Sequence, residues 1–294
     1  MPAHNVTVVT RRGFLTRSVS AAAFAAGLPA ALRAADAPAK KLKGNIRQGV
    51  SLWSCKLGKL DKACEVVASL GMAGIDLIHP DAAETLKKYN LTCTMMSTKG
   101  HGIPVGFNRK ENHDKCVEAV SKAIEAAAEL GWRNVICFSG NRKGLPDDEG
   151  LANCVVGLKR VAPLAEKKKV YVCMELLNSK QHKDYMADSS DWGAKMCEGV
   201  GSDRIKLLFD IYHMAMMEED VIAQIRKHHK YIGHYHTGGY PGRAEIDLKS
   251  QKTDYAAVMK VILETKFDGY VAHEFVPKRD PVKSLTEAVE ICDV

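Results

Sequence analysis

Four side chains able to bind a metal ion each follow a short, mainly apolar run: Glu175, Asp210, His236 and Glu274, at spacings of 35, 26 and 38 residues. A buried carboxylate is costly unless it is paired or bound to a cation. Three carboxylates and one imidazole suit Mn²⁺, Mg²⁺ or Co²⁺ better than an ion that prefers thiolates. Each residue alone is explained equally well as a salt-bridge partner or a strand-end cap. The prediction of one divalent metal site therefore depends on all four residues occurring together.

These residues would be positioned by eight short apolar runs that alternate with segments of helical periodicity. The alternation is typical of βα units on a parallel sheet. Gly71, Gly131 and Gly199 stand where helix C-caps are expected. The predicted strands are 46–52, 74–78, 92–97, 134–138, 170–176, 205–209, 231–236 and 269–275. The predicted helices are 60–70, 113–130, 151–167, 190–199, 219–227, 254–266 and 281–291.

Eight βα units in residues 38–294 predict a single-domain α/β fold, the (β/α)₈ TIM barrel. In such a barrel the C-terminal ends of the strands meet at one mouth, which would bring the four residues together. A doubly wound open sheet is the alternative. It is disfavoured because Ser51-Leu52-Trp53-Ser54, after the first strand, is not a glycine-rich phosphate loop.

At these positions the chain resembles the xylose isomerase-like barrel superfamily, and within it the hydroxypyruvate isomerase and ketose 3-epimerase group. The most specific motif is Phe209-Asp210-Ile211-Tyr212-His213-Met214. Residues 232–236, 241–243, 174–178 and 272–275 complete the pattern, and residues 100–108 are similar to the family's loop after the third strand.

The resemblance implies one divalent metal ion held by Glu175, Asp210, His236 and Glu274. It also implies that the two glutamates act as acid and base. His213 and Arg243 would hold substrate oxygens.

The residue types suit proton abstraction next to a carbonyl group. That step creates an enediolate, whose developing charge a divalent ion stabilises. Two glutamates across the mouth could remove and return the proton, giving isomerisation or epimerisation. Arg243 offers bidentate geometry to a carboxylate, although an arginine in a Pro-Gly-Arg turn is also explained as a solvated charge.

The resemblance implies interconversion of hydroxypyruvate and tartronate semialdehyde, or of a related small hydroxy-carbonyl compound or ketose. Two alternatives stay open. One is a periplasmic keto-sugar epimerase or lyase using the same proton abstraction, and residues 178–185 differ from the pattern of many relatives. The other is a non-catalytic, exported carbohydrate-binding barrel. An abasic-site endonuclease is disfavoured because it needs more histidine ligands.

Three further residues stand at strand ends: Trp53, His79 and His101. Trp53 could form an apolar wall of the pocket or pack in the ordinary way. Each histidine alone is more often a loop residue than a participant in chemistry.

Residues 1–37 are predicted to be an export signal. Arg11 and Arg12 precede a small-residue apolar stretch and the cleavage-like Ala35-Asp36-Ala37. This pattern resembles a bacterial twin-arginine signal, which places the mature protein in the periplasm. Because that route carries folded proteins, reduced cysteines are compatible with export.

The amino-acid composition limits the kinds of partner that the chain is expected to bind. The net charge is +7, of which residues 1–37 contribute +3, and the remaining charge is interleaved in sign, which argues against a nucleic acid partner. The nine cysteines form no C-x-x-C pair and are predicted to be buried thiols. No apolar run is long enough to span a membrane. The sequence does not decide whether the chain forms homo-oligomers.

Overall fold

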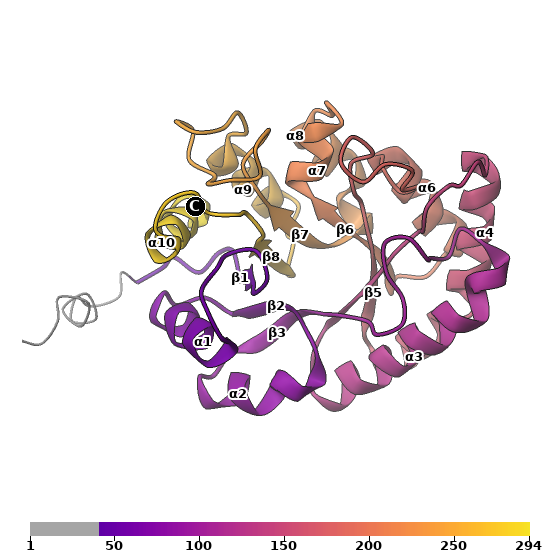
Figure 1. The fold of residues 1–294 in the computed structure, drawn as a ribbon, viewed down its shortest axis with the longest axis horizontal. Helices are drawn as coiled ribbons and strands as arrows, with labels where there is room; N and C mark the ends of the chain where they lie inside the picture. The colour runs from indigo at the N-terminus through magenta and orange to yellow at the C-terminus, as the bar shows by residue number, and fades with distance from the viewer. Residues whose placement is uncertain (1–40) are drawn as a thin grey trace, which may run out of the picture. The chain divides into compact units, whose positions relative to one another are not determined.

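Eight parallel strands close into a barrel in the computed structural model, which describes residues 41–294 (Figure 1). Each strand pairs with the next along the chain, and β8 pairs with β1. The TIM barrel prediction is confirmed, whereas the predicted export signal at residues 1–37 lies outside the described residues. The strands are β1 (Gln48–Ser51), β2 (Gly74–Ile78), β3 (Thr92–Met96), β4 (Asn134–Cys137), β5 (Tyr171–Glu175), β6 (Ile205–Asp210), β7 (Ile232–Thr237) and β8 (Tyr270–His273).

Helices surround the barrel on its outer side (Figure 1). They are α1 (Leu60–Ser69), α2 (Ala83–Lys88), α3 (His113–Glu129), α4 (Asp147–Lys159), α5 (Ala162–Lys168), α6 (Ser190–Val200), α7 (Ile211–Met216), α8 (Val221–His228), α9 (Tyr255–Glu264) and α10 (Pro281–Cys292). Three single 3₁₀ turns accompany them: η2 (Pro80–Ala82), η3 (Lys110–Asn112) and η4 (His229–Tyr231).

Two predictions about the helices were wrong. The single helix expected over 151–167 is two helices, α4 and α5, with Pro163 in the first turn of α5. Proline is tolerated in a first turn but not in a helix interior, because it lacks an N–H and clashes with the preceding turn. Gly199 lies inside α6, and Gly201, with φ +76°, caps that helix instead. The short helices α2 and α7 were not predicted.

The main hydrophobic core lies between the helices and the barrel. On α3, for example, Cys116, Val120, Ala123, Ile124 and Ala127 are buried, a stripe at helical spacing. A second, smaller cluster consists of one buried residue from each of β3, β4, β5 and β6: Met95, Ile136, Cys173 and Leu208. Because Ile136 also lines the cavity at the mouth, this cluster borders that cavity.

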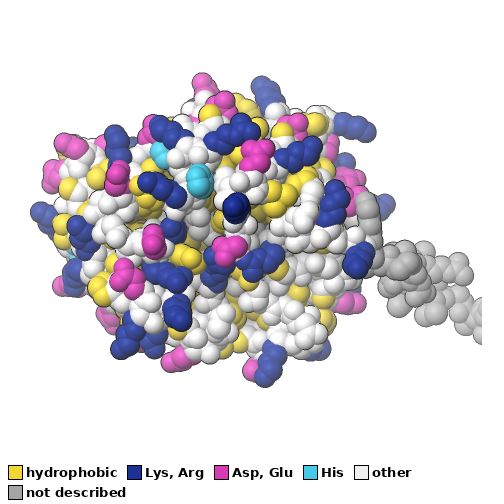
Figure 2. Space-filling view, turned by 180° about the vertical axis from the view of Figure 1, so that it is seen from behind, with side chains coloured by type: hydrophobic (Ala, Val, Ile, Leu, Met, Phe, Trp, Pro, Cys, Tyr) yellow, Lys and Arg dark blue, Asp and Glu magenta, His cyan; other side chains and the backbone are white. Residues whose placement is uncertain are grey.

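All nine cysteines are free and buried, as predicted. Burial raises the pKa of Cys64 and of Cys116 to about 11, so that both thiols stay protonated at neutral pH. Within residues 41–294, no helix has the length and apolar character needed to cross a membrane. Figure 2 shows basic and acidic side chains intermixed on the face opposite to that of Figure 1.

Candidate active site

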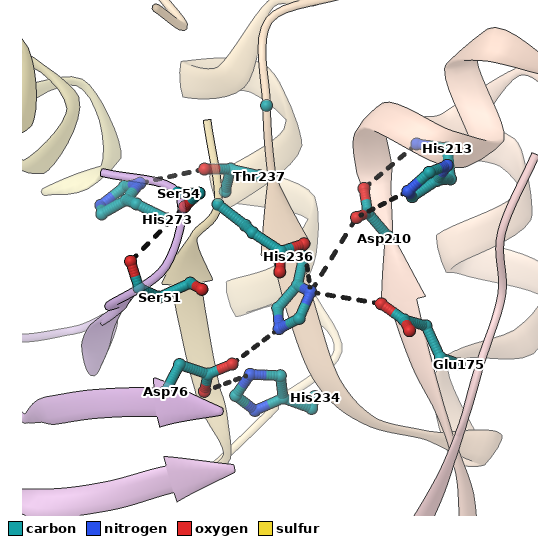
Figure 3. A network of polar contacts seen from close by, with 12 residues as sticks. Ser51, Ser54, Asp76, Glu175, Asp210, His213, His234, His236, Thr237 and His273 are labelled. Atoms are coloured by element: carbon teal, nitrogen blue, oxygen red, sulfur yellow. Dashed lines mark hydrogen bonds and ion pairs between the residues drawn. The ribbon is translucent and has the colours of Figure 1, made fainter. Parts of the chain in front are cut away.

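The four predicted metal ligands meet at one end of the barrel. Glu175 ends β5, Asp210 ends β6, His236 lies near the end of β7, and Glu274 directly follows β8. All four are buried, and one ligand atom of each lies within 4.8 Å of the others. From His236 Nδ1, the nearest carboxylate oxygens are Glu274 Oε2 at 3.1 Å, Glu175 Oε1 at 3.7 Å and Asp210 Oδ2 at 3.9 Å (Figure 3).

A fifth residue, Asp76, fixes the orientation of His236. Its Oδ2 lies 2.8 Å from His236 Nε2, on the side of the ring away from Glu175 (Figure 3). Its Oδ1 accepts a hydrogen bond from Thr94 Oγ1 at 2.6 Å and lies 3.1 Å from His234 Nε2. A carboxylate that holds one ring nitrogen of a histidine sets the tautomer and aims the other nitrogen at the site.

Asp76 was not among the predicted site residues. The signal was present, because it is the single charged side chain in the buried run 74–78. The run gives no sign of its bulge, however. The register of β2 against β3 shifts on both sides of Asp76, and Leu77 has φ +56°. Bulges re-aim side chains, and they are common next to active sites.

The ring nitrogen Nδ1 of His236 faces the three carboxylates of the cluster. It is buried and has no hydrogen-bond partner among the described residues, although Glu274 Oε2 lies 3.1 Å away. Burial disfavours a charged ring, but the carboxylates of Glu274 and Asp76 outweigh this effect and raise the pKa of His236 well above its usual value. The surroundings of His236 therefore favour positive charge at this point.

Arg243 points into the mouth, and it is not the solvated loop charge of the alternative interpretation. Its guanidinium donates to Glu274 and lies 3.5 Å from Asp210 Oδ2. It packs between the rings of Trp53 and Tyr212, at 5.5 and 5.2 Å from their centroids. Its side chain is only 16% exposed.

His213 lies beside Arg243. Asp210 Oδ1 accepts the backbone N–H of His213 at 3.1 Å and so caps the start of α7. The backbone N–H of Asn178 donates to His213 Nδ1 at 3.1 Å, which leaves Nε2 facing Arg243 Nη1 at 3.1 Å. Burial lowers the pKa of His213 to about 4, so the ring is neutral at neutral pH.

The two glutamates have opposite pKa shifts. Burial, reinforced by the negative charge of Glu274, raises the pKa of Glu175. Burial acts on Glu274 in the same direction, but His236 and Arg243 outweigh it and lower the pKa of Glu274. Two carboxyl groups whose surroundings separate their pKa values are the usual arrangement of an acid and a base.

The residues fit a divalent cation. Three carboxylates face one another. Burial together with the neighbouring carboxylates raises the pKa of Glu175, while, against the effect of burial, Glu274 and Asp76 raise that of His236, so the cluster attracts positive charge. The unpartnered His236 Nδ1 faces the same space. Carboxylate oxygens with one imidazole nitrogen are a suitable donor set for such an ion.

The cluster opens into a cavity of about 510 Å³ at the mouth of the barrel. Trp53 and His79 line it, together with His101. His101 has both ring nitrogens engaged: Nδ1 lies 3.1 Å from Val105 O, and Nε2 accepts the backbone N–H of Phe138 at 2.8 Å. His101 therefore ties the loop after β3 to the end of β4.

The family that matches this sequence is described as Xylose isomerase-like TIM barrel, and the match covers residues 64–292. This chain belongs to that family. The match includes the ends of β5, β6, β7 and β8, where the four clustered residues lie.

Curated relatives in the family are isomerases and epimerases. Hydroxypyruvate isomerase of Escherichia coli is 25% identical over 227 residues, which cover 73% of this chain and 86% of that protein. The 2-oxo-tetronate isomerase of Cupriavidus necator is 27% identical over 163 residues, 54% of this chain, and the alignment spans only 61% of that protein. D-psicose 3-epimerase of Agrobacterium fabrum is 26% identical over 245 residues, 72% of this chain and 82% of that protein.

Solved structures share the fold at lower identity. An AP endonuclease, family 2, from Brucella melitensis superposes with a TM-score of 0.72 at 19% identity, over 82% of this chain and 97% of that one. The IOLI protein, solved with a binding zinc atom, superposes with a TM-score of 0.64 at 16% identity, over 84% of this chain and 95% of that one. At these identities the likeness shows the barrel fold alone.

Proposed function

We propose that this protein is a metal-dependent isomerase or epimerase of a small hydroxy-carbonyl compound, with Glu175 and Glu274 as acid and base. The observation that carries the proposal is that the two glutamates belong to one buried cluster with Asp210 and His236 and also line the cavity at the mouth of the barrel. The names of the curated relatives support the same reaction class.

The proposed chemistry moves one proton. Ionised Glu274 takes the proton from the carbon next to the carbonyl, the C–H electron pair forms a C=C bond, and the carbonyl π pair moves onto oxygen. Protonated Glu175 then gives its proton to the opposite face of the same carbon, which epimerises it. Alternatively, the proton goes to the neighbouring carbon while the hydroxyl proton passes to the former carbonyl oxygen, which isomerises the substrate. Proton exchange between the two glutamates restores the starting state.

Glu175, Asp210, His236 and Glu274 would hold the cation, and Asp76 would hold the His236 ring. The bound ion would supply positive charge next to the enediolate oxygens. Arg243 and His213 border the same space and would bind substrate oxygens from the other side. The zinc atom bound in the IOLI protein, which shares the barrel fold, supports the proposal of a metal site here, while the ion used by this chain stays a prediction among Mn²⁺, Mg²⁺ and Co²⁺.

Hydroxypyruvate, converted to tartronate semialdehyde, is the first candidate substrate. Its carboxylate matches the bidentate geometry of Arg243, and a relative carries the same activity in its name. The second candidate is a keto-sugar that undergoes epimerisation or elimination. The cavity of about 510 Å³ favours it, because a three-carbon acid would leave most of that space to water.

Turnover by the purified chain tests the proposal. The protein is stripped with a chelator, reloaded with Mn²⁺, Mg²⁺ or Co²⁺, and assayed with hydroxypyruvate, ketoses and keto-glycosides. We expect activity only after reloading, and a loss of about 10²-fold or more in kcat for Glu175→Gln and for Glu274→Gln. A non-catalytic carbohydrate-binding barrel would instead bind sugars without turning any over, and Glu274→Gln would have no activity to remove.

We also propose that the twin-arginine pattern exports the protein to the periplasm. Arg11 and Arg12 support this proposal. Expression of the full chain in a bacterium with this export route, followed by cell fractionation, is the test. The double change Arg11→Lys, Arg12→Lys should retain the protein in the cytoplasm, and an unchanged periplasmic fraction would contradict the export proposal.

A further inference from the structure

Trp53 combines two contacts in a way that ordinary packing does not explain. It follows β1 at the rim of the cavity and is 59% exposed, the one aromatic among the strongly exposed large apolar side chains of residues 41–294. Its indole N–H nevertheless donates to Glu274 Oε1 at 2.8 Å. One edge of the ring is thus bound to the buried cluster while much of its surface faces solvent.

The ring is held in place from two sides. The hydrogen bond to Glu274 fixes its edge, and the guanidinium of Arg243 lies 5.5 Å from its centroid. A fixed, exposed indole presents a large apolar surface whose ordering lowers the entropy cost of binding. Such a surface suits the C–H face of a sugar ring.

We propose that Trp53 is a binding platform for a sugar portion of the substrate that extends beyond the reacting carbons, and that its N–H positions Glu274. The proposal rests on the proposed function and names its substrate class. The cavity volume lies in the ~300–1,000 Å³ range of pockets for drug-sized ligands.

Apart from Glu175, Glu274, Arg243 and four histidines, the residues within 41–294 that line the cavity are uncharged. Ser97 and Thr98 line it together with the apolar residues Ile103 and Phe138. Such a lining suits a neutral polyol better than a charged group.

The cavity offers little for a phosphate group. Among the described residues that line it, Arg243 is the single lysine or arginine, and it contacts Glu274 and Asp210, next to the proposed reacting carbons. Phosphate binding relies on charge-assisted donors of this kind. The sugar portion is therefore expected to be unphosphorylated.

Two substitutions separate the two roles of Trp53. Trp53→Phe keeps an aromatic face but removes the N–H donor, so kcat should fall by about 10-fold or more for both short and long substrates, with KM for a ketohexose little changed. Trp53→Leu removes both the aromatic face and the N–H donor. In that variant, KM for a ketohexose should also rise by up to about 10-fold, while KM for hydroxypyruvate stays within about 2-fold.

Val156→Ala is the matched control. Val156 is 52% exposed on α4, on the outside of the barrel, so this change should leave both kinetic constants unaltered. Equal KM values for the ketohexose in wild type and Trp53→Leu would overturn the platform. An unchanged kcat in Trp53→Phe would overturn the positioning role.

A binding measurement keeps the proposal independent of turnover. A hexitol has the hydroxyl groups of a sugar but no carbonyl, so calorimetry with a hexitol reports binding alone. We expect its Kd to rise several-fold in Trp53→Leu and to stay near the wild-type value in Trp53→Phe and Val156→Ala. Equal hexitol binding in wild type and Trp53→Leu would overturn the platform. If the reloaded wild type binds the hexitol but turns over no substrate, the proposed function fails while the platform stands.

Discussion

His236 illustrates how one residue depends on a second that is not a ligand. Its Nε2 is bound by Asp76, and its Nδ1 faces three carboxylates. Asp76 is in turn held by Thr94 and His234. The orientation of the imidazole is thus determined by β2 and β3, on the other side of the barrel from β6 and β7.

At this scale we predict that Asp76→Asn weakens metal binding by about 10–100-fold, because a neutral amide holds the His236 ring less firmly. Isothermal titration of the stripped protein with Mn²⁺ measures the affinity. Asp61→Asn is the control, since Asp61 is exposed and pairs with Lys88 on the outer surface. Wild-type affinity in Asp76→Asn would show that the imidazole does not need this partner.

Glu245 links the elements that carry Arg243 and Glu274. It lies in the segment after β7, and its Oε1 accepts the backbone N–H groups of Lys278 and Arg279 and the hydroxyl of Ser284, each at 2.9 Å. Those three residues belong to the segment after β8 and to the start of α10. The two segments that form this side of the mouth are therefore held together by one buried carboxylate.

Replacing Glu245 by Gln should lower the free energy of unfolding by about 1–3 kcal/mol at pH 7. Burial acts to raise the pKa of Glu245, but the backbone N–H groups and the Ser284 hydroxyl outweigh burial and lower it from 4.5 to about 2. The stabilisation is therefore complete above about pH 4.5 and is lost as the pH falls toward 2.

Urea unfolding at pH 7 and at pH 2.5 checks this. The difference in the free energy of unfolding between wild type and Glu245→Gln should be large at pH 7 and smaller at pH 2.5. A difference that is the same at both values would mean that the ionised carboxylate contributes no stability here.

The strands and the residues at their ends could be predicted from the sequence, but some details of their arrangement could not. The eight strands follow from short β-branched runs, and β2 was predicted with its observed bounds. The polar residues at the ends of β5 to β8 could be placed together because barrel topology brings those ends to one mouth. The bulge at Leu77 and the hydrogen bond of Trp53 to Glu274 could not be predicted, because both depend on packing between distant segments.

At the scale of the whole molecule, the loop after β3 lines one side of the mouth and is held by a neutral histidine, His101. Burial lowers the pKa of His101 to about 4, and the neutral ring joins Val105 to Phe138. Because the folded-state pKa lies below the usual 6.5, this stabilisation is complete above about pH 6.5 and is lost as the pH falls toward 4.

We therefore expect the thermal midpoint of the wild type to fall between pH 7 and pH 4.5 by more than that of His101→Gln, whose side chain does not titrate. Calorimetric scans of both proteins at several pH values provide the comparison. Parallel pH profiles would contradict the assigned role of His101.

Deuterium incorporation from solvent tests the central claim most directly. The metal-reloaded protein is incubated in D₂O with hydroxypyruvate, a ketohexose or a keto-glycoside, and the carbon next to the carbonyl is followed by NMR. The account predicts deuterium at that carbon for the true substrate, lost on metal removal and reduced by about 10²-fold or more in Glu274→Gln. Product formed without any solvent deuterium, or exchange that persists in Glu274→Gln, would contradict proton abstraction by this glutamate.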